Sequence, residues 1–174
     1  MNQQTSATTR GEVTLRDVAA GDLDIFFEQQ RDPEANYMAA FTARDPDDRD
    51  AFVAHWNKIM GDASITTQTI LYGGQVAGSV SIYESELGPE VTYWLGKEYW
   101  GKGIATAALA QFLTRIQTRP IHGRAAKDNF GSVRVLQKCG FVVVGEDRGF
   151  ANARGEEIAE YVLILRATEP GEAQ

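Results

Sequence analysis

Hydrophobic and polar residues change their spacing several times along this 174-residue chain, and each change predicts a new element. A short alternating run over Val13–Arg16 predicts a strand. Asp22 then precedes several apolar residues and is an acceptable N-cap for a helix. Residues 32–50 contain prolines and several acids, and we expect them to form a loop. A second helix follows, with apolar residues at three- and four-residue spacing at Phe52, Val53, Trp56, Ile59 and Met60.

The middle of the chain predicts strands. Residues 66–72 and 75–83 are rich in β-prone side chains, and Gly73 and Gly74 separate them. Both glycines can adopt positive φ, so this two-residue connection predicts an antiparallel hairpin. A further strand is expected over Glu90–Leu95.

An amphipathic helix is predicted after a glycine-rich loop. Its apolar residues lie four positions apart, at Ile104, Ala108, Phe112 and Ile116. A strand over Ile121–Ala126 follows, and then a short helix from near Ser132, which we expect Gly140 to end in the left-handed conformation. Residues 142–144 and 161–165 predict two late strands.

Composition and charge are those of one globular domain, which we expect at residues 12–166 between flexible ends at 1–11 and 167–174. No apolar run approaches the ~20 residues of a membrane span, and the polar start lacks a secretory signal, so we expect a cytoplasmic protein. One cysteine, Cys139, and two histidines provide no zinc cluster, so no metal is expected. The net charge of −7 argues against nucleic-acid binding and suits a cationic acceptor such as an amine.

The most informative stretch is residues 93–106, where a strand passes through Gly101-Lys102-Gly103 into the amphipathic helix. The N–H groups at a helix N-terminus are unpaired and carry partial positive charge, and glycines let a phosphate approach them. Two nucleotide motifs fit poorly, because a P-loop needs Ser or Thr in place of Gly103 and a dinucleotide fingerprint needs Gly or Ala in place of Thr106. The alternative is that the glycines only shape a tight connection.

The segment Asn129–Phe141 lies about 25 residues after this loop and completes a family pattern. The chain resembles the GNAT superfamily of N-acetyltransferases, specifically its ribosomal-protein-alanine N-acetyltransferase-like (RimJ/RimL-type) branch. Three blocks carry the resemblance, at 90–95, 99–106 and 129–141, and the likeness extends from Val13 to Leu165. It implies an α/β fold, a single domain with a mixed, mostly antiparallel sheet of about seven strands flanked by helices.

The resemblance also implies acetyl-CoA as the acyl donor. The strand matching Tyr93–Leu95 would offer backbone groups to the pantetheine arm, the amides of residues 99–106 would hold the pyrophosphate, and Lys102 would add positive charge. Asn129 would contact pantetheine and Lys138 the nucleotide end, with a turn cap and a solvated helix residue as the respective alternatives. The residues expected to bind acetyl-CoA are Trp94, Leu95, Tyr99, Trp100, Gly101, Lys102, Gly103, Ile104, Ala105, Thr106, Asn129 and Lys138.

At two positions the sequence differs from the residues that are usual in the superfamily. Many members have a tyrosine that would protonate the leaving thiolate where this chain has Leu136, and Gln or Arg where it has Glu98. Glu90 is our candidate base, acting directly or through water, because the strand match places it near the cleft; a solvated or salt-bridged Glu90 is the alternative. Ser132 would donate a hydrogen bond to the sulfur, although a serine at a helix start is often a cap. A backbone N–H near Leu95 would stabilise the oxyanion.

We therefore expect an acetyl-CoA-dependent N-acyltransferase that acetylates a primary amine by direct attack in a ternary complex. The acceptor is either the N-terminal α-amine of a protein or a small-molecule amine, and the protein is a monomer or a homodimer. A non-catalytic CoA-binding module on the same fold is the alternative. A nucleotide-binding protein is a third hypothesis, and it predicts stabilisation by ATP or NAD instead of acetyl-CoA.

Overall fold

The structure is a computed structural model that describes residues 11–169, so most of the two predicted flexible ends lies outside the described residues. The elements, in chain order, are β1 (Val13–Asp17), α1 (Asp22–Arg31), α2 (Pro33–Ala39), α3 (Arg49–Gly61), β2 (Thr66–Tyr72), β3 (Gln75–Ser85), β4 (Gly88–Leu95), the 3-10 helix η1 (Lys97–Tyr99), α4 (Ile104–Thr114), β5 (Ile121–Ala126), α5 (Phe130–Lys138), β6 (Val142–Ala151) and β7 (Glu156–Leu165). Within residues 11–169, no helix combines the length and hydropathy needed to cross a membrane.

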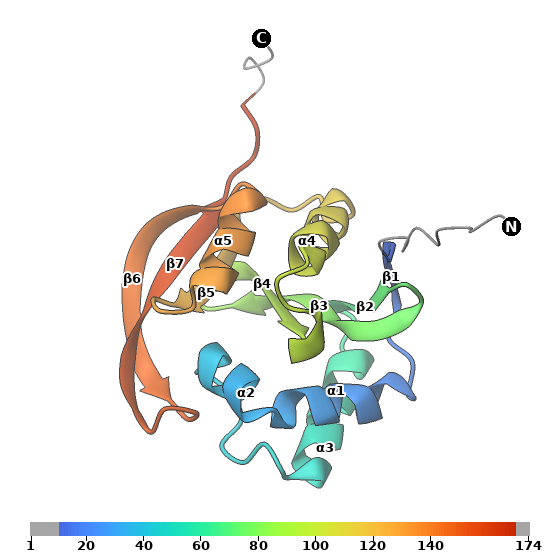
Figure 1. Ribbon diagram of the computed structural model, residues 1–174. Coiled ribbons are helices and arrows are strands. Elements are labelled where there is room, and N and C mark those ends of the chain that lie inside the picture. Colours follow the sequence, from blue (N-terminus) through green and yellow to red (C-terminus); the bar gives the residue numbers. More distant parts are fainter. Residues whose placement is uncertain (1–10, 170–174) are drawn as a thin grey trace, which may run out of the picture.

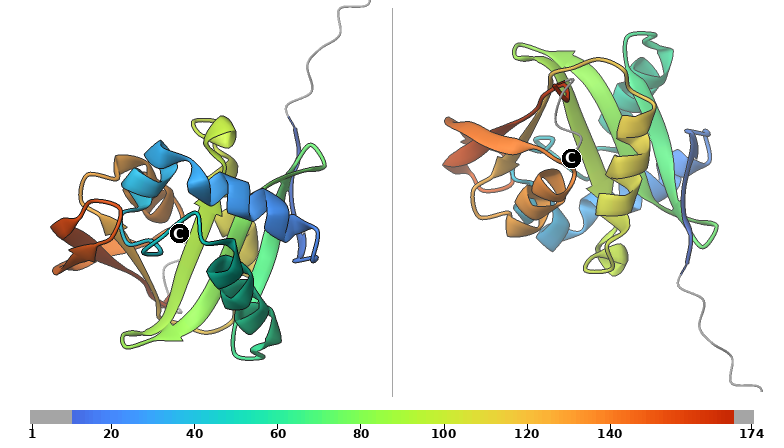
Figure 2. Two further views of the ribbon diagram at one scale, coloured as in Figure 1. Left: turned by 90° about the horizontal axis from the view of Figure 1, so that it is seen from below. Right: turned by 90° about the horizontal axis from the view of Figure 1, so that it is seen from above.

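Seven strands form one sheet in the order β1-β2-β3-β4-β5-β7-β6. Every neighbouring pair is antiparallel except β4 and β5, which run parallel. Helices α4 and α5 cover one face, which we call the upper face, and α1, α2 and α3 lie against the other, lower face (Figures 1 and 2). The expected α/β fold with a mixed, mostly antiparallel sheet is confirmed.

The main core lies between the upper face and α4. Ala108, Leu109 and Phe112 are fully buried there and pack with Val80 of β3 and Leu163 of β7. Burying each large apolar side chain contributes roughly 1.5–3 kcal/mol, so the four-residue repeat of α4 fixes this helix to the sheet. A smaller apolar cluster, formed by side chains of α1 and α3, lies against the lower face.

Glycine positions predicted from sequence have the expected backbone conformations. Gly73 and Gly74 connect β2 and β3 with φ of 57° and 80°, as a tight hairpin turn requires. Gly140 follows α5 with φ of 94°, and the Phe141 N–H donates to the Leu136 carbonyl at 3.1 Å. The predicted end of this helix is therefore confirmed.

The expected loop at residues 32–50 is wrong in its first part, which forms α2, and at Arg49 and Asp50, which begin α3. Asp32 caps this helix, because its carboxylate accepts a hydrogen bond from the Ala35 N–H at 2.9 Å. Pro33 occupies the first helical position, where its missing N–H is not needed. These local signals outweigh the weak apolar pattern of the segment.

Three other expectations about element ends need correction. Gly21, and not Asp22, stands at the N-cap of α1. Asp22 lies inside the helix, where it pairs with Arg16 and accepts from the Ala19 N–H at 2.9 Å. The late strands β6 and β7 have ten residues each, longer than expected, because they pair with each other along their whole length.

The parallel neighbours β4 and β5 separate almost at once. Among the described residues their register contains one pair, Glu90 with His122. The remainder of β4, from Thr92 to Leu95, pairs with β3 on one side and faces a gap on the other. Backbone groups along this edge are available to other partners.

Candidate active site

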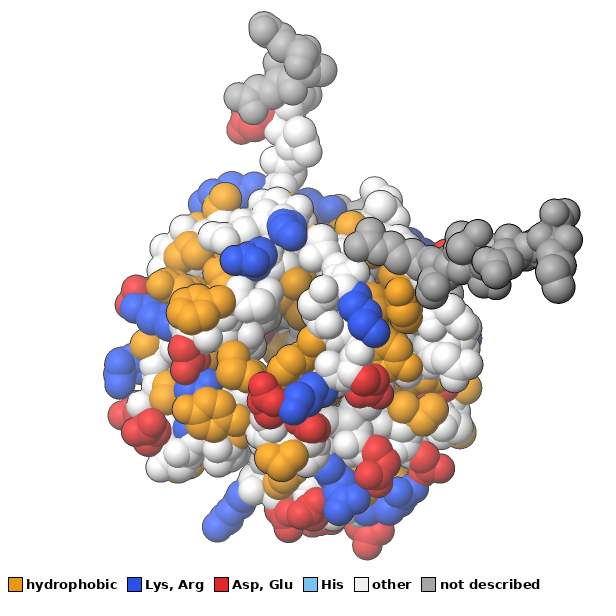
Figure 3. Space-filling model, in the orientation of Figure 1, with side chains coloured by type: hydrophobic (Ala, Val, Ile, Leu, Met, Phe, Trp, Pro, Cys, Tyr) orange, Lys and Arg blue, Asp and Glu red, His pale blue; other side chains and the backbone are white. Residues whose placement is uncertain are grey.

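A cavity of about 510 Å³ opens at the gap between β4 and β5, and the space-filling view is hollowed near the centre of the corresponding face (Figure 3). Three consecutive β4 residues, Tyr93, Trp94 and Leu95, line it. Because successive strand side chains point to opposite faces, the cavity reaches both sides of the sheet. Its lining consists of Ala35, Met38, Ala39, Tyr93, Trp94, Leu95, Tyr99, Trp100, Gly101, Gly103, Ile104, Ala105, Thr106, Asn129, Gly131, Ser132, Arg134, Val135 and Lys138.

The N-terminus of α4 borders the upper part of this cavity. Gly103 precedes the helix with φ of 75° and Gly101 has φ of 72°, a conformation that favours glycine. A Cβ at either position would have no neighbour within 4 Å, so conformation, not crowding, requires these glycines. The first hydrogen bond within the helix is donated by Ala107, at 3.1 Å to the Gly103 carbonyl. The amides before Ala107 therefore have no helical acceptor and form a site suited to an anion.

Two cations of α5 lie on the same side of this cavity. Arg134 and Lys138 are four residues apart and both line the wall, in agreement with their helical spacing. Lys102 does not line it, since its ammonium lies 6.0 Å from the ring centroids of Tyr72 and Tyr99. A contribution of Lys102 to phosphate binding stays a prediction. Sequence reasoning missed Arg134, although its spacing from Lys138 was visible.

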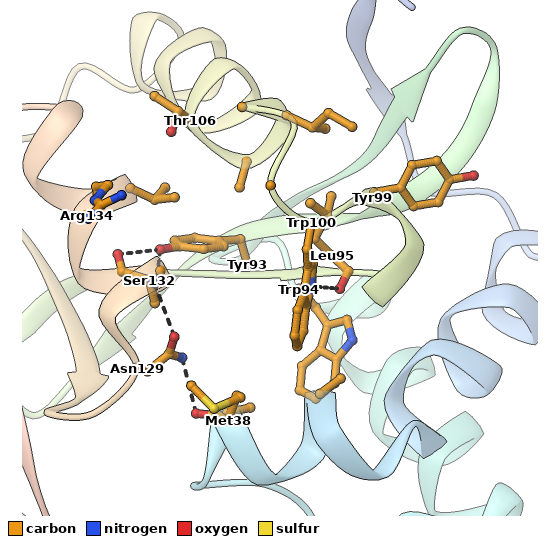
Figure 4. Close-up of a pocket in the computed structure, with 18 of the residues that line it drawn as sticks. Met38, Tyr93, Trp94, Leu95, Tyr99, Trp100, Thr106, Asn129, Ser132 and Arg134 are labelled. Carbon is orange, nitrogen blue, oxygen red and sulfur yellow. Dashed lines mark hydrogen bonds between the residues drawn. The ribbon is translucent and has the colours of Figure 1, made fainter.

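The end of β4 is fixed by two hydrogen bonds. The Trp100 indole N–H donates to the Leu95 carbonyl at 3.0 Å (Figure 4), and the Gly96 N–H donates to the Ala77 carbonyl at 2.9 Å. These two backbone groups are thus occupied. The backbone donor expected for an oxyanion near Leu95 stays a prediction, and an N–H on the open edge of β4 between Thr92 and Leu95 is available for it.

Tyr93 and Ser132 form a hydroxyl pair across the cavity. Their oxygens lie 2.8 Å apart, and the Tyr93 hydroxyl also lies within donating distance, 3.1 Å, of the Ser132 carbonyl (Figure 4). Burial raises the pKa of Tyr93 to about 12, so the phenol keeps its proton near neutral pH. Both hydroxyls thus carry a proton, and the pair joins β4 to α5 at the cavity wall.

Asn129 connects the two walls of the lower part of the cavity. Its Oδ1 accepts from the Ser132 N–H at 3.2 Å and caps α5, so Asn129, and not Ser132, is the cap of this helix. Its Nδ2 donates to the Met38 carbonyl of α2 at 3.1 Å (Figure 4). The alternative interpretation of Asn129 as a cap is confirmed. Its contact with pantetheine stays a prediction.

Glu90 lies outside the cavity lining and has three hydrogen-bond donors. Tyr83 donates its hydroxyl at 3.0 Å, and Arg124 donates from Nε and Nη2 at 3.1 and 3.0 Å. The residue is 5% exposed, so the salt-bridged alternative describes its state in this structure. Its action as a base stays a prediction. Arg124, 34 positions away, was not identified from sequence.

Burial also affects other titratable groups near these strands. The pKa of Tyr83 is raised to about 12, first by burial and then by the charge of Glu90. Burial raises the pKa of Glu160 on β7, and nearby Arg124 opposes this shift. Residues 11–169 contain no group of three or more His, Cys, Asp or Glu side chains placed to hold a metal ion.

Comparison with known proteins identifies a family. The acetyltransferase (GNAT) domain family matches residues 12–142. The "Putative ribosomal N-acetyltransferase YdaF" of Bacillus subtilis (strain 168) is 27% identical over 130 residues, which are 70% of this chain and 71% of that protein. An uncharacterized N-acetyltransferase, p20 of Bacillus licheniformis, is 25% identical over 167 residues, 90% of this chain and 94% of the relative.

Solved structures have the same fold. Mycobacterium smegmatis RimJ in complex with CoA-disulfide superposes with a TM-score of 0.77 at 21% identity, over 92% of this chain and 85% of that one. Spermidine N-acetyltransferase from Vibrio cholerae, in complex with CoA and spermine, gives 0.76 at 20% identity, over 88% of this chain and 95% of that one. Because the family match covers most of the chain and includes the glycine loop, β4 and α5, the protein belongs to the GNAT family of acetyltransferases.

Proposed function

We propose that the protein transfers an acetyl group from acetyl-CoA to a primary amine by direct attack in a ternary complex. The observation that carries this proposal is the course of one cavity. It runs from the anion-binding N-terminus of α4, above the sheet, through the gap between β4 and β5 to α2 below it. A donor bound above the sheet and an acceptor approaching from below can meet in that gap.

The donor would be held mainly by backbone groups. The free amides before Ala107 would bind the pyrophosphate, the open edge of β4 and Asn129 would contact the pantetheine arm, and Arg134 and Lys138 would attract the nucleotide phosphate. Lys102 would attract the phosphates only at longer range, because its ammonium lies over the rings of Tyr72 and Tyr99.

Transfer requires that a neutral amine nitrogen attack the thioester carbonyl and form a C–N bond, which gives a tetrahedral oxyanion; the C–S bond breaks as this intermediate collapses. The nitrogen loses a proton and the thiolate gains one. An N–H on the open edge of β4 would stabilise the oxyanion. The Ser132 hydroxyl, supported by Tyr93, would donate a hydrogen bond to the departing sulfur. Glu90 would accept the amine proton through water, since its carboxylate does not line the cavity.

The acceptor class follows from the branch of the family. The glycine loop and the Asn129–Phe141 block support a place in the RimJ/RimL-type branch, and one relative is named as a ribosomal N-acetyltransferase. The N-terminal α-amine of a protein is therefore the first candidate acceptor, and small-molecule amines are the second. We place the reaction in the cytoplasm, where acetyl-CoA and both kinds of amine occur.

The test compares thermal unfolding with acetyl-CoA, CoA, ATP and NAD, and then follows thiol release with a panel of amines. We expect a rise in Tm with the CoA species alone, because a ligand selective for the folded state stabilises it. We also expect thiol release with ribosomal-protein N-terminal peptides. Release with spermidine alone would assign a small-molecule acceptor. Stabilisation without release from any amine would indicate a non-catalytic CoA-binding module, and stabilisation by ATP or NAD alone would refute the proposal.

A further inference from the structure

The start of the gap between β4 and β5 is spanned by one charged side chain. Arg124 extends from β5 across the gap to Glu90 on β4 and donates two hydrogen bonds to its carboxylate, at 3.1 and 3.0 Å. Glu90 is also the β4 residue of the single backbone pair between these strands, with His122. The two hydrogen bonds from Arg124 therefore lie where regular pairing ends, three residues before Tyr93, the first β4 residue that lines the cavity.

Arg124 has a second carboxylate on its other side. Its Nη1 lies 3.6 Å from Oε1 of Glu160 on β7, so the guanidinium connects β4, its own strand β5, and β7. The side chains of Glu90 and Glu160 are 7% and 10% exposed, and that of Arg124 is 31% exposed. Two poorly hydrated carboxylates thus depend on one guanidinium for compensation of their charge.

We propose that Arg124 is a positioning residue: its paired contact with Glu90 fixes the separation of β4 and β5, and so sets the width of the cavity that receives acetyl-CoA. This inference rests on the proposed function, because it assigns the cavity to the acyl donor. It concerns the geometry of the gap and holds whether or not Glu90 takes the amine proton.

The energetics of buried ion pairs provide a direct test. Removing one partner leaves an uncompensated buried charge and is strongly destabilising, whereas replacing both with neutral groups of similar volume is often close to neutral. Arg124→Met leaves Glu90 charged and unpaired, so water will enter the gap and the strands will separate. In Glu90→Gln/Arg124→Met, Tyr83 still donates to residue 90 and no charge is left unpaired there. Glu160 loses only its longer contact, at 3.6 Å, and burial already raises its pKa, so it can take up a proton and the strands can close.

A matched control is present on the far side of the sheet. Arg16 forms a similar two-pronged pair with Asp22, at 2.6 and 2.8 Å, and these side chains are 40% and 6% exposed. That pair connects β1 to α1, and neither residue lines the cavity. Arg16→Met therefore reports the effect of breaking a comparable ion pair without touching the gap.

The experiment measures the Kd of CoA by titration calorimetry for the wild type and these variants, with thermal unfolding in parallel. We expect Arg124→Met to weaken CoA binding roughly tenfold, Arg124→Lys to give an intermediate loss because it lacks the fork, and the double variant to recover to within about threefold of the wild type. Arg16→Met should lower Tm and leave the Kd unchanged.

Three results would overturn the inference: an unchanged Kd in folded Arg124→Met, a double variant as weak as the single one, or an equal loss of affinity in Arg16→Met. If Arg124→Met does not fold, Arg124→Lys and the double variant still decide. Failure of the wild type to bind CoA would instead refute the proposed function. The kcat of the double variant separates the two roles of Glu90, as an ion-pair partner and as a base. If Glu90 is the base, the double variant will bind CoA with restored affinity but will keep a low kcat.

Discussion

The hydroxyl of Tyr93 on β4 lies 2.8 Å from the hydroxyl of Ser132 on α5, across the cavity that separates strand from helix. The resemblance described above would place a tyrosine, as the proton donor for the thiolate, at the position of Leu136. Here Leu136 is 1% exposed and belongs to the core. The strand thus supplies a phenol from the opposite wall.

Replacement of Tyr93 by Phe tests whether this pair assists thiol departure. We expect Tyr93→Phe and Ser132→Ala each to lower kcat by roughly a hundredfold, the lower end of the range for one lost hydrogen bond to a developing charge. The Kd of CoA should change little, since neither hydroxyl is needed for the phosphate contacts. Steady-state kinetics and calorimetry check both values. Tyr161→Phe, on β7 and outside the cavity lining, is the control and should keep the wild-type kcat.

Substitution of Gly103 by Ala tests the anion site of α4. Left-handed backbone costs an alanine about 1–2 kcal/mol, so the loop will shift to avoid it and misplace the free amides. Gly155 at the β6–β7 turn is a matched control, with φ of 67° and no atom within 4 Å of an added Cβ. Both variants should lose a similar free energy of unfolding in urea, but only Gly103→Ala should bind CoA more weakly in calorimetry. A loss of CoA affinity in Gly155→Ala as large as in Gly103→Ala would contradict this assignment.

Asp22 predicts a pH dependence of stability. The hydrogen bond from Arg16 is the main cause that lowers its pKa to about 2, from an ordinary value near 3.9. A depressed carboxyl pKa stabilises the fold above about pH 4, and this contribution disappears as pH falls toward 2; its size is roughly 2 kcal/mol. Asp22→Asn should therefore be less stable than the wild type at pH 7 in urea unfolding, and the difference should shrink as pH falls from about 4 to about 2. Asp24→Asn, at a carboxylate 71% exposed, should show a much smaller difference at every pH.

Glu160 predicts the opposite sign. Burial is the main cause that raises its pKa, with Asp147 and Glu90 adding to the shift and Arg124 opposing it. The unfolded chain therefore loses this proton more readily, and the folded protein is penalised as pH rises above the ordinary value near 4.3. Glu160→Gln should raise the free energy of unfolding at pH 8, and the gain should shrink toward pH 4. Glu156→Gln, exposed on the same strand, should show no such trend; equal behaviour would refute the role of burial.

Local signals predicted much of the fold. The pair Gly73-Gly74, the four-residue repeat of α4 and the stop at Gly140 depend on neighbouring residues, and each is confirmed. Helix α2 was missed although Asp32-Pro33 is a recognisable start, because the segment lacks a clear apolar period. The ends of β6 were missed because its charged and glycine residues adopt strand conformation through pairing with β7, which no local pattern reveals.

The candidate site was predictable only where its residues are consecutive in the sequence. The glycine loop and the start of α4 are contiguous, so their geometry could be anticipated from residues 93–106. The partners Glu90 and Arg124 are 34 positions apart, and Tyr93 and Ser132 are 39 apart. Strand order and helix packing bring each pair together. Without knowledge of the strand order, Glu90 could be identified as a carboxylate near the cleft, but Arg124 could not be identified as its partner.

Within residues 11–169, the single backbone pair between Glu90 and His122 is the only rung between the two halves of the seven-stranded sheet. Strands β1–β4 form one body and β5–β7 form the other, and the core beneath α4 joins them. A ligand in the gap would touch both bodies at once. Its binding energy would then act on the junction, so amide exchange should slow most along β4 at Thr92–Leu95 and hardly at all in the β2–β3 hairpin. The bound substrate would thus supply contacts between β4 and β5 that the sheet itself lacks.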